Sequence, residues 1–161
     1  MKHTLTALVE NKPGVLAHII GVISGRGYNI ETLCVGPTQD NSCSKITMVV
    51  PGDDRVLEQV TLQVTKQIDV LRVTDVTRQR HISRELILVE LATGKTGRAP
   101  IMELAALFSA QIVAVQASSL TLQYAGDEPQ TADFLRTLRD FDVLDIARSG
   151  VIAVSRGNHD D

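Results

Sequence analysis

A polar turn near the start of the chain joins a strand pattern to a helix pattern, and this junction restricts the fold more than any other feature. Residues 3–10 are typical of a strand. Residues 11–14 read Asn-Lys-Pro-Gly, in which asparagine is a good N-cap and proline is favoured in a first helical turn. The apolar residues that follow have the spacing of one helix face: Leu16, Ile19, Ile20 and Ile23. The chain therefore begins with a strand, a turn and a helix.

The pattern that follows predicts one small-domain topology. Two glycines, at positions 25 and 27, indicate the end of the helix. A second strand is predicted to contain Ile30 and to be closed by Pro37, and further strands are predicted at 46–50 and 68–76. Asp53 can cap a helix between these last two strands, with an apolar side formed by Val56, Val60 and Val64. The resulting order, β-α-β-β-α-β, is the ferredoxin-like arrangement.

The second half of the chain repeats this order without repeating the sequence. Strands are predicted at 82–92, 111–117, 119–125 and within 143–155, and helices near 101–108 and after 127–129. We therefore predict an α+β fold of two ferredoxin-like βαββαβ domains, at residues 1–77 and 78–161, joined at a polar, basic segment. Because aromatic residues make up only 3% of the chain and tryptophan is absent, we expect an aliphatic core.

Composition argues against several classes of partner. The net charge of −3 disfavours strong electrostatic attraction to nucleic acid, and the strand at 46–50 offers no aromatic ring for base stacking. No apolar run approaches the roughly 20 residues that a membrane-spanning helix needs. Cys34 and Cys43 are interpreted as reduced thiols of a cytoplasmic protein. We therefore expect neither nucleic acid nor membrane as a partner.

Catalytic patterns are missing from the sequence. The histidines and cysteines have no metal-ligand spacing, and no serine occupies a Gly-x-Ser-x-Gly turn. We therefore predict no catalytic residues, no metal site and no cofactor bound by this chain itself.

The turn at residues 11–14 has two interpretations. It is either a capped helix start and nothing more, or a site for a small zwitterion with an aliphatic tail. Backbone N–H groups at a helix N-terminus attract a carboxylate, Gly14 allows close approach, and the Asn11 amide both donates and accepts hydrogen bonds. Asn29, which precedes Ile30 at a predicted strand start, can face the same helix end. The pair of asparagines favours the ligand site.

These same segments carry a family resemblance. The runs 11–16 and 26–33 closely resemble the small regulatory subunits of acetolactate synthase, also called acetohydroxyacid synthase. The likeness continues through 56–59, 69–73, 84–86 and 147–150, so it covers nearly the whole chain, although the stretch after Ala92 matches weakly. The first half looks like an ACT domain, a ferredoxin-like module that binds amino acids.

The resemblance implies a non-catalytic protein. Such a subunit binds the large catalytic subunit, which carries thiamine diphosphate, Mg²⁺ and FAD, raises its activity, and makes it sensitive to feedback inhibition by valine in branched-chain amino-acid biosynthesis. Because one methylene changes affinity by only about 1–3 kcal/mol, leucine and isoleucine are expected to bind more weakly rather than not at all. A free-standing ACT-type amino-acid sensor that acts on another partner is the alternative.

The resemblance also assigns residues. Family members form homodimers that hold the effector between paired ACT domains. The effector turn of the family falls on Asn11 and Gly14, and the partner strand position falls on Asn29. The residues expected to contact the aliphatic tail of valine are Val15, Leu16 and Ile30. The C-terminal domain is the expected contact with the catalytic subunit.

Overall fold

The computed structural model describes residues 1–156, which form two four-stranded sheets, each covered on one face by two helices. The elements of the first half are β1 (Lys2–Glu10), α1 (Val15–Ser24), β2 (Thr32–Pro37), β3 (Cys43–Pro51), α2 (Asp54–Thr65) and β4 (Val70–Asp75). Those of the second half are β5 (His81–Ala92), α3 (Arg98–Phe108), β6 (Gln111–Val115), β7 (Ser119–Gly126), α4 (Glu128–Thr137), a 3₁₀ turn (Leu138–Asp140) and β8 (Val143–Ser155). The α+β fold and the repeated β-α-β-β-α-β order are thus confirmed.

The chain divides into two compact units, which we describe separately. One contains Met1–Ile82 together with the described residues after Gly150, and the other is Ser83–Gly150. The expected ranges were 1–77 and 78–161, but residues 78–82 and the last residues of β8 group with the first unit. Residues 157–161 of the expected second range lie outside the described residues.

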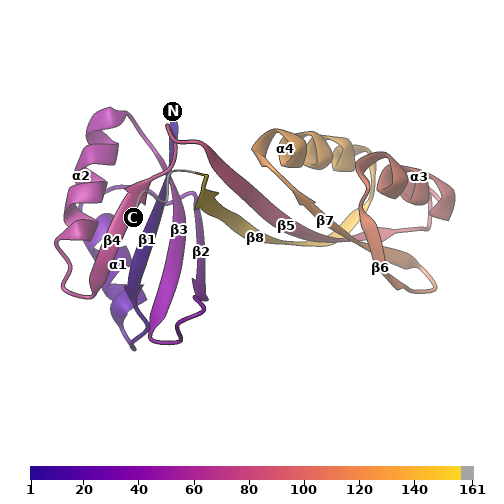
Figure 1. The fold of residues 1–161 in the computed structure, drawn as a ribbon. Coiled ribbons are helices and arrows are strands. Elements are labelled where there is room, and N and C mark those ends of the chain that lie inside the picture. Colours follow the sequence, from indigo (N-terminus) through magenta and orange to yellow (C-terminus); the bar gives the residue numbers. More distant parts are fainter. Residues whose placement is uncertain (157–161) are drawn as a thin grey trace. The chain divides into compact units, whose positions relative to one another are not determined.

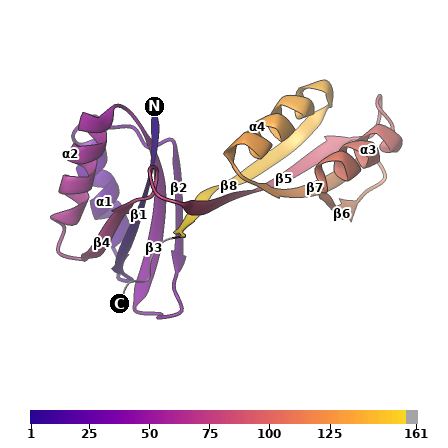
Figure 2. The same cartoon turned by 45° about the horizontal axis from the view of Figure 1, so that its top comes forward.

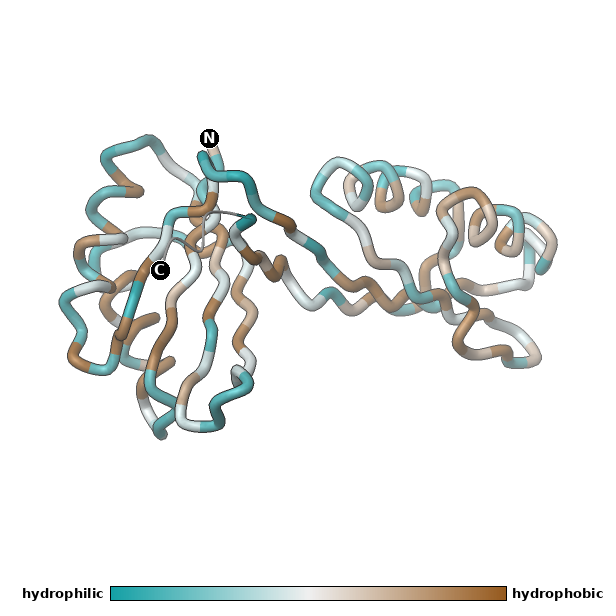
Figure 3. The backbone as a smooth tube through the Cα atoms, viewed as in Figure 1, coloured by the Kyte–Doolittle hydropathy of each residue, from teal (hydrophilic) through white to brown (hydrophobic). Residues whose placement is uncertain are grey.

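The first unit has an antiparallel sheet in the order β2-β3-β1-β4, with α1 and α2 on one face (Figure 1). Its core is aliphatic, and the strands of this unit include long apolar stretches between polar turns (Figure 3). The buried side chains come from alternate positions along the strands and from one face of each helix. They are Leu5, Ala7, Val9, Val15, Ile19, Ile23, Ile46, Met48, Val50, Val60 and Val64. Because β2 has a neighbour on one side only, its outer edge is open.

The start of α1 differs in detail from the sequence-based prediction. Gly14, not Asn11, is the N-cap residue, and it adopts the left-handed conformation with φ 87° and ψ −17°. The buried face of α1 consists of Val15, Ile19 and Ile23, whereas Leu16 is 37% exposed. Of the predicted face, Ile19 and Ile23 are thus buried and Ile20 is half-buried, while Val15 takes the place expected for Leu16.

Helix α2 begins after the predicted cap residue and buries its predicted apolar side. The Asp53 side chain accepts a hydrogen bond from the Val56 N–H at 3.0 Å, and Val60 and Val64 are buried. By contrast, Ile30 was predicted to lie in the second strand, but β2 begins only at Thr32. Ile30 nevertheless packs, half-buried, against the core of the first unit.

The second unit has the strand order β6-β7-β5-β8, again with both helices on one face (Figure 2). The prediction of a wholly aliphatic core is wrong here. Phe134 is fully buried, with its ring centroid 4.4 Å from that of Tyr124 and 5.2 Å from that of Phe108. Three of the few aromatic residues of the chain are therefore concentrated in one cluster. Burial raises the pKa of the Tyr124 hydroxyl.

Candidate amino-acid site at the start of helix α1

The turn between β1 and α1 is held by the turn between β2 and β3. The Asn11 backbone N–H donates to the carbonyl oxygen of Ser42 at 2.7 Å, and the Asn11 side-chain Nδ2 donates to the carbonyl oxygen of Asn41 at 3.0 Å. Asn11 is itself exposed, so its amide oxygen remains accessible. The amide that the sequence marked as a ligand group thus also fixes the shape of the turn.

The N-terminus of α1 is open. No side chain caps it, and its first turn contains no acidic residue. Within residues 1–156, the backbone N–H groups of Leu16 and Ala17 have no hydrogen-bond acceptor, whereas the Asp53 carboxylate caps α2 and the Asp127 carboxylate caps α4. Unpaired N–H groups and the helix dipole both favour a bound anion at this end.

Gly14 leaves space in front of these N–H groups. A Cβ atom placed on Gly14 would meet nothing within 4 Å, so the space belongs to solvent rather than to the protein. The positive φ suits glycine, and among other residues it is best tolerated by asparagine and aspartate. A carboxylate can therefore approach the backbone here without displacing a side chain.

The turn before α1 carries an ion pair. Lys12 makes an ion pair with Glu10, which lowers the pKa of the Glu10 carboxyl and raises the pKa of the Lys12 amine. Both groups are therefore ionised at neutral pH. After Glu10, Asp69 also contributes to the raised pKa of the Lys12 amine, so the side chains here are two carboxylates and one ammonium group. The local attraction for an anion therefore comes from the helix end.

The apolar candidates differ in accessibility. Val15 is only 6% exposed and belongs to the core of the first unit, whereas Leu16 is exposed in the first turn of α1. Leu16 is thus the apolar side chain at this end of the helix that a ligand reaches most readily.

One chain does not bring Asn29 and Ile30 together with Asn11 and Gly14. The Glu31 N–H donates to the carbonyl oxygen of Val49, and the sheet register aligns Val49 with Thr4 near the start of β1. Glu10, at the other end of β1, pairs with Cys43. The expectation that Asn29 faces the start of α1 is therefore wrong within a single chain, because the whole length of the helix lies between them.

Three further features of the described residues concern thiols, metal ligands and membrane-spanning helices. Cys34 and Cys43 are free thiols. No cluster of three metal-ligating side chains is found within residues 1–156. None of the helices in that range is both long enough and apolar enough to cross a membrane.

Comparison with known proteins decides the family. Residues 5–72 match the family described as the AHAS small subunit-like ACT domain, and residues 84–157 match the family described as the small subunit of acetolactate synthase. A probable acetolactate synthase small subunit from Archaeoglobus fulgidus is 42% identical over 98% of this chain and 99% of its own length. This chain belongs to the acetolactate synthase small-subunit family.

Further relatives agree with this assignment. The acetolactate synthase isozyme 3 small subunit of Escherichia coli is 40% identical over 98% of both chains. The crystal structure of the acetolactate synthase small subunit from Thermotoga maritima superposes with a TM-score of 0.89 at 28% identity, and the match covers 98% of this chain and 99% of that one. The family inferred from the sequence and the ACT domain in the first half of this family member are thus confirmed.

Sequence reasoning missed the role of the turn at residues 38–42 in this small subunit. The carbonyl groups of Asn41 and Ser42 in that turn accept hydrogen bonds from Asn11. No local signal identifies such a contact, because the two turns are far apart in the sequence and meet only through the pairing of β1 with β3.

Proposed function

We propose that this chain is the non-catalytic regulatory subunit of an acetolactate synthase. It binds a large catalytic subunit, raises its activity and makes it sensitive to feedback inhibition by valine. The names of the relatives support the first step, since a small subunit implies a larger one. The catalytic partner carries thiamine diphosphate, Mg²⁺ and FAD in this proposal, and the small subunit contributes no cofactor.

The open N-terminus of α1 beside Gly14 is the observation that carries the proposed valine site. The valine carboxylate accepts hydrogen bonds from the free N–H groups of Leu16 and Ala17. The exposed Leu16 side chain contacts the isopropyl group, and Val15 forms the floor behind it. The Asn11 amide oxygen accepts from the ammonium group, because the amide nitrogen already donates to Asn41.

Asn29 and Ile30 enter this site from a second copy of the chain. Strand β2 lies at the edge of its sheet, and Val35 on that strand is 40% exposed. If two copies pair β2 with β2 in antiparallel orientation about a twofold axis, the start of each β2 lies beside the end of the other. Asn29 precedes the start of β2, and Gly14 lies toward its end, so this dimer brings Asn29 of one chain toward Gly14 of the other.

Inhibition requires coupling between this site and the catalytic subunit. Bound valine must favour an arrangement of the regulatory dimer that supports catalysis less well, and such couplings are typically about 1–3 kcal/mol. We place the contact with the catalytic subunit on the second unit. The edge strands of that unit leave large apolar side chains exposed: Ile112, Val113, Val115, Leu144 and Ile146.

Affinity capture with the full-length tagged chain tests the proposal. Recovery of a thiamine-diphosphate-dependent acetolactate synthase from extract, with activity that rises on addition of the chain and falls on addition of valine, is the expected result. Valine binding without any such enzyme would favour the free-standing sensor instead. Acetolactate formation by the purified chain alone would contradict a purely regulatory role.

A further inference from the structure

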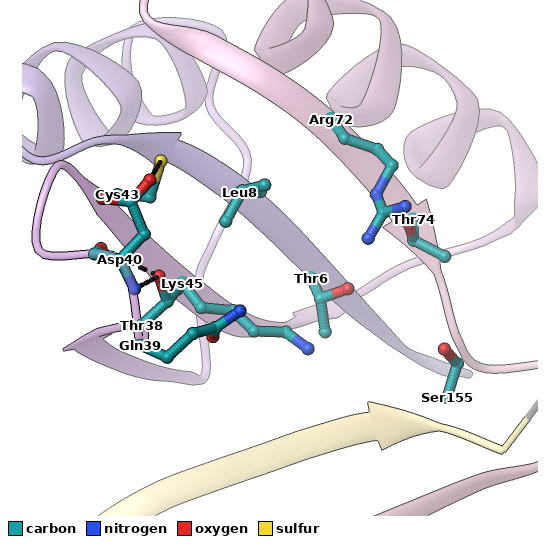
Figure 4. A pocket seen from close by; sticks show the side chains of 10 residues that line it. All are labelled: Thr6, Leu8, Thr38, Gln39, Asp40, Cys43, Lys45, Arg72, Thr74 and Ser155. Atoms are coloured by element: carbon teal, nitrogen blue, oxygen red, sulfur yellow. Dashed lines mark hydrogen bonds between the residues drawn. The ribbon is translucent and has the colours of Figure 1, made fainter. Parts of the chain in front are cut away.

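The face of the first sheet that carries no helix contains a polar cavity of about 350 Å³. Strands β1, β3 and β4 form its floor, and the turn between β2 and β3 forms one wall (Figure 4). Every residue that lines it belongs to the first unit. The cavity lies on the opposite face of the sheet from α1, so it is separate from the proposed valine site.

The sheet register brings two cations to this cavity. Leu8 on β1 pairs with Lys45 on β3 and with Arg72 on β4, so the three side chains form a row across one face of the sheet. Adjacent strands are about 4.8 Å apart, which places the backbones of Lys45 and Arg72 about 10 Å from each other. Both side chains are long enough to reach a ligand between them.

Hydroxyl groups form the next row of the same face. Thr6 pairs with Thr47 on one side and with Thr74 on the other, and Thr6 and Thr74 line the cavity. In Figure 4, the Arg72 guanidinium lies beside Thr74, and Thr6 lies between Arg72 and Lys45. Hydroxyl donors therefore stand next to the cationic groups, as in a site for an oxyanion.

Among residues 1–156, no carboxylate pairs with either cation. Within residues 1–156, Lys45 and Arg72 make no ion pair and no side-chain hydrogen bond, although Lys12 and Arg78 each pair with a carboxylate. Asp40 is the one carboxylate among the described residues of the lining, and its Oδ1 already accepts from the N–H and the hydroxyl of Ser42, at 2.9 and 2.7 Å. Two unpaired cations in a cavity of a chain with net charge −3 form a local attraction for anions.

We infer that this cavity binds a small metabolite that carries two oxyanion groups, either phosphate or carboxylate. Lys45 holds one group and Arg72 the other, with hydrogen bonds from the hydroxyls of Thr6 and Thr74. Leu8 contacts the part of the ligand that links the two groups. The volume lies within the range of about 300–1,000 Å³ that is usual for small-molecule sites.

Titration calorimetry on the full-length chain with three probes tests the inference: inorganic phosphate, pyrophosphate and succinate. Pyrophosphate or succinate is expected to bind saturably and more tightly than inorganic phosphate, because each has two anionic groups. Preference for pyrophosphate assigns the site to phosphate compounds, and preference for succinate assigns it to dicarboxylates. Absence of saturable binding by all three probes would overturn the inference.

Charge-removing variants locate the site. Lys45→Gln and Arg72→Gln are each expected to weaken the better probe about tenfold or more, as the loss of a charge-assisted hydrogen bond predicts. Lys66→Gln removes an exposed cation outside the cavity and should leave the affinity unchanged. Valine affinity and the melting temperature of each variant report on folding. Wild-type probe affinity in the Lys45→Gln/Arg72→Gln double variant would refute the site.

Discussion

Gly14 and Asn29 lie beyond opposite ends of helix α1, although the proposed valine site needs both. The helix between them has 10 residues, which corresponds to about 15 Å along its axis. A ligand as small as valine cannot contact both ends in one chain. The proposed site therefore consists of Gly14 from one chain and Asn29 from the other, and this composition can be tested directly.

A mixed dimer is expected to recover one valine site. Gly14→Asp and Asn29→His should each abolish tight binding in a homodimer. A heterodimer of the two variants, purified through two different tags, contains one site with both substitutions and one site with neither. Calorimetry should then find half of the wild-type stoichiometry at near wild-type affinity. A heterodimer that binds no valine would show that each site is formed within one chain.

The substitution Gly14→Asp is expected to weaken valine binding through charge rather than through misfolding. A carboxylate at this position lies next to the carboxylate of valine, and repulsion between unit charges 4–8 Å apart is worth about 2–4 kcal/mol at the effective dielectric constant of a protein surface. Gly14→Asn is the matched control, because asparagine has the same shape, tolerates the left-handed backbone and is uncharged. Calorimetry should show a much larger loss for aspartate than for asparagine, and equal losses would contradict the proposed pose.

The Glu10 carboxyl is expected to titrate below its usual pKa of 4.5, since the side chain of Lys12 stabilises its charged form. Its stabilising contribution is present above pH 4.5 and is lost as the pH falls through the lowered pKa in the folded state. The raised pKa of Lys12 has the opposite dependence, so its contribution is lost only as the pH rises above 10.5.

An NMR titration of the Glu10 side chain checks this prediction. Lys12→Met should return the midpoint toward 4.5, whereas Lys66→Met should have no effect. Valine binding should vary little with pH around neutrality, because both members of the pair remain charged there. An unchanged Glu10 midpoint in Lys12→Met would exclude the ion pair.

Phe134→Ala is expected to destabilise the second unit by about 3–5 kcal/mol, the usual cost of truncating a fully buried phenylalanine. The chain has two tyrosines and no tryptophan, so a Tyr28→Phe background leaves Tyr124 as the fluorescent reporter beside Phe134. Urea unfolding followed by this signal measures the loss, and Phe134→Leu should cost less. A loss under about 1 kcal/mol for Phe134→Ala would mean that the aromatic cluster is not a principal part of the core.

The order of elements could be predicted from the sequence because it depends on local patterns. Asp53 marks the start of α2, and periodic apolar residues mark the strands and helices on either side. The aromatic cluster could not be predicted from composition, because a small number of rings can still meet when the fold brings three of them to one core.

The candidate site was predicted less completely than the fold. Asn11 and Gly14 begin and end the same four-residue turn, so local sequence places them together. Within one chain, Asn29 lies at the other end of α1 from Gly14, since the direction of a strand relative to the preceding helix follows from the pairing of β2 with β3, not from residues 26–33. The contribution of Asn29 from a second chain stays a prediction. The row formed by Lys45, Leu8 and Arg72 likewise depends on the register between three strands.

The short turn between β2 and β3 connects the two proposed ligand sites. Its Asn41 carbonyl holds the Asn11 side chain, while Asp40 borders the cavity on the other face of the sheet. Because the turn is common to both sites, its displacement by a molecule in one site would alter the shape of the other. Under such linkage each compound changes the affinity of its counterpart by an identical factor, which would let a second metabolite adjust how much valine is needed to switch the enzyme off.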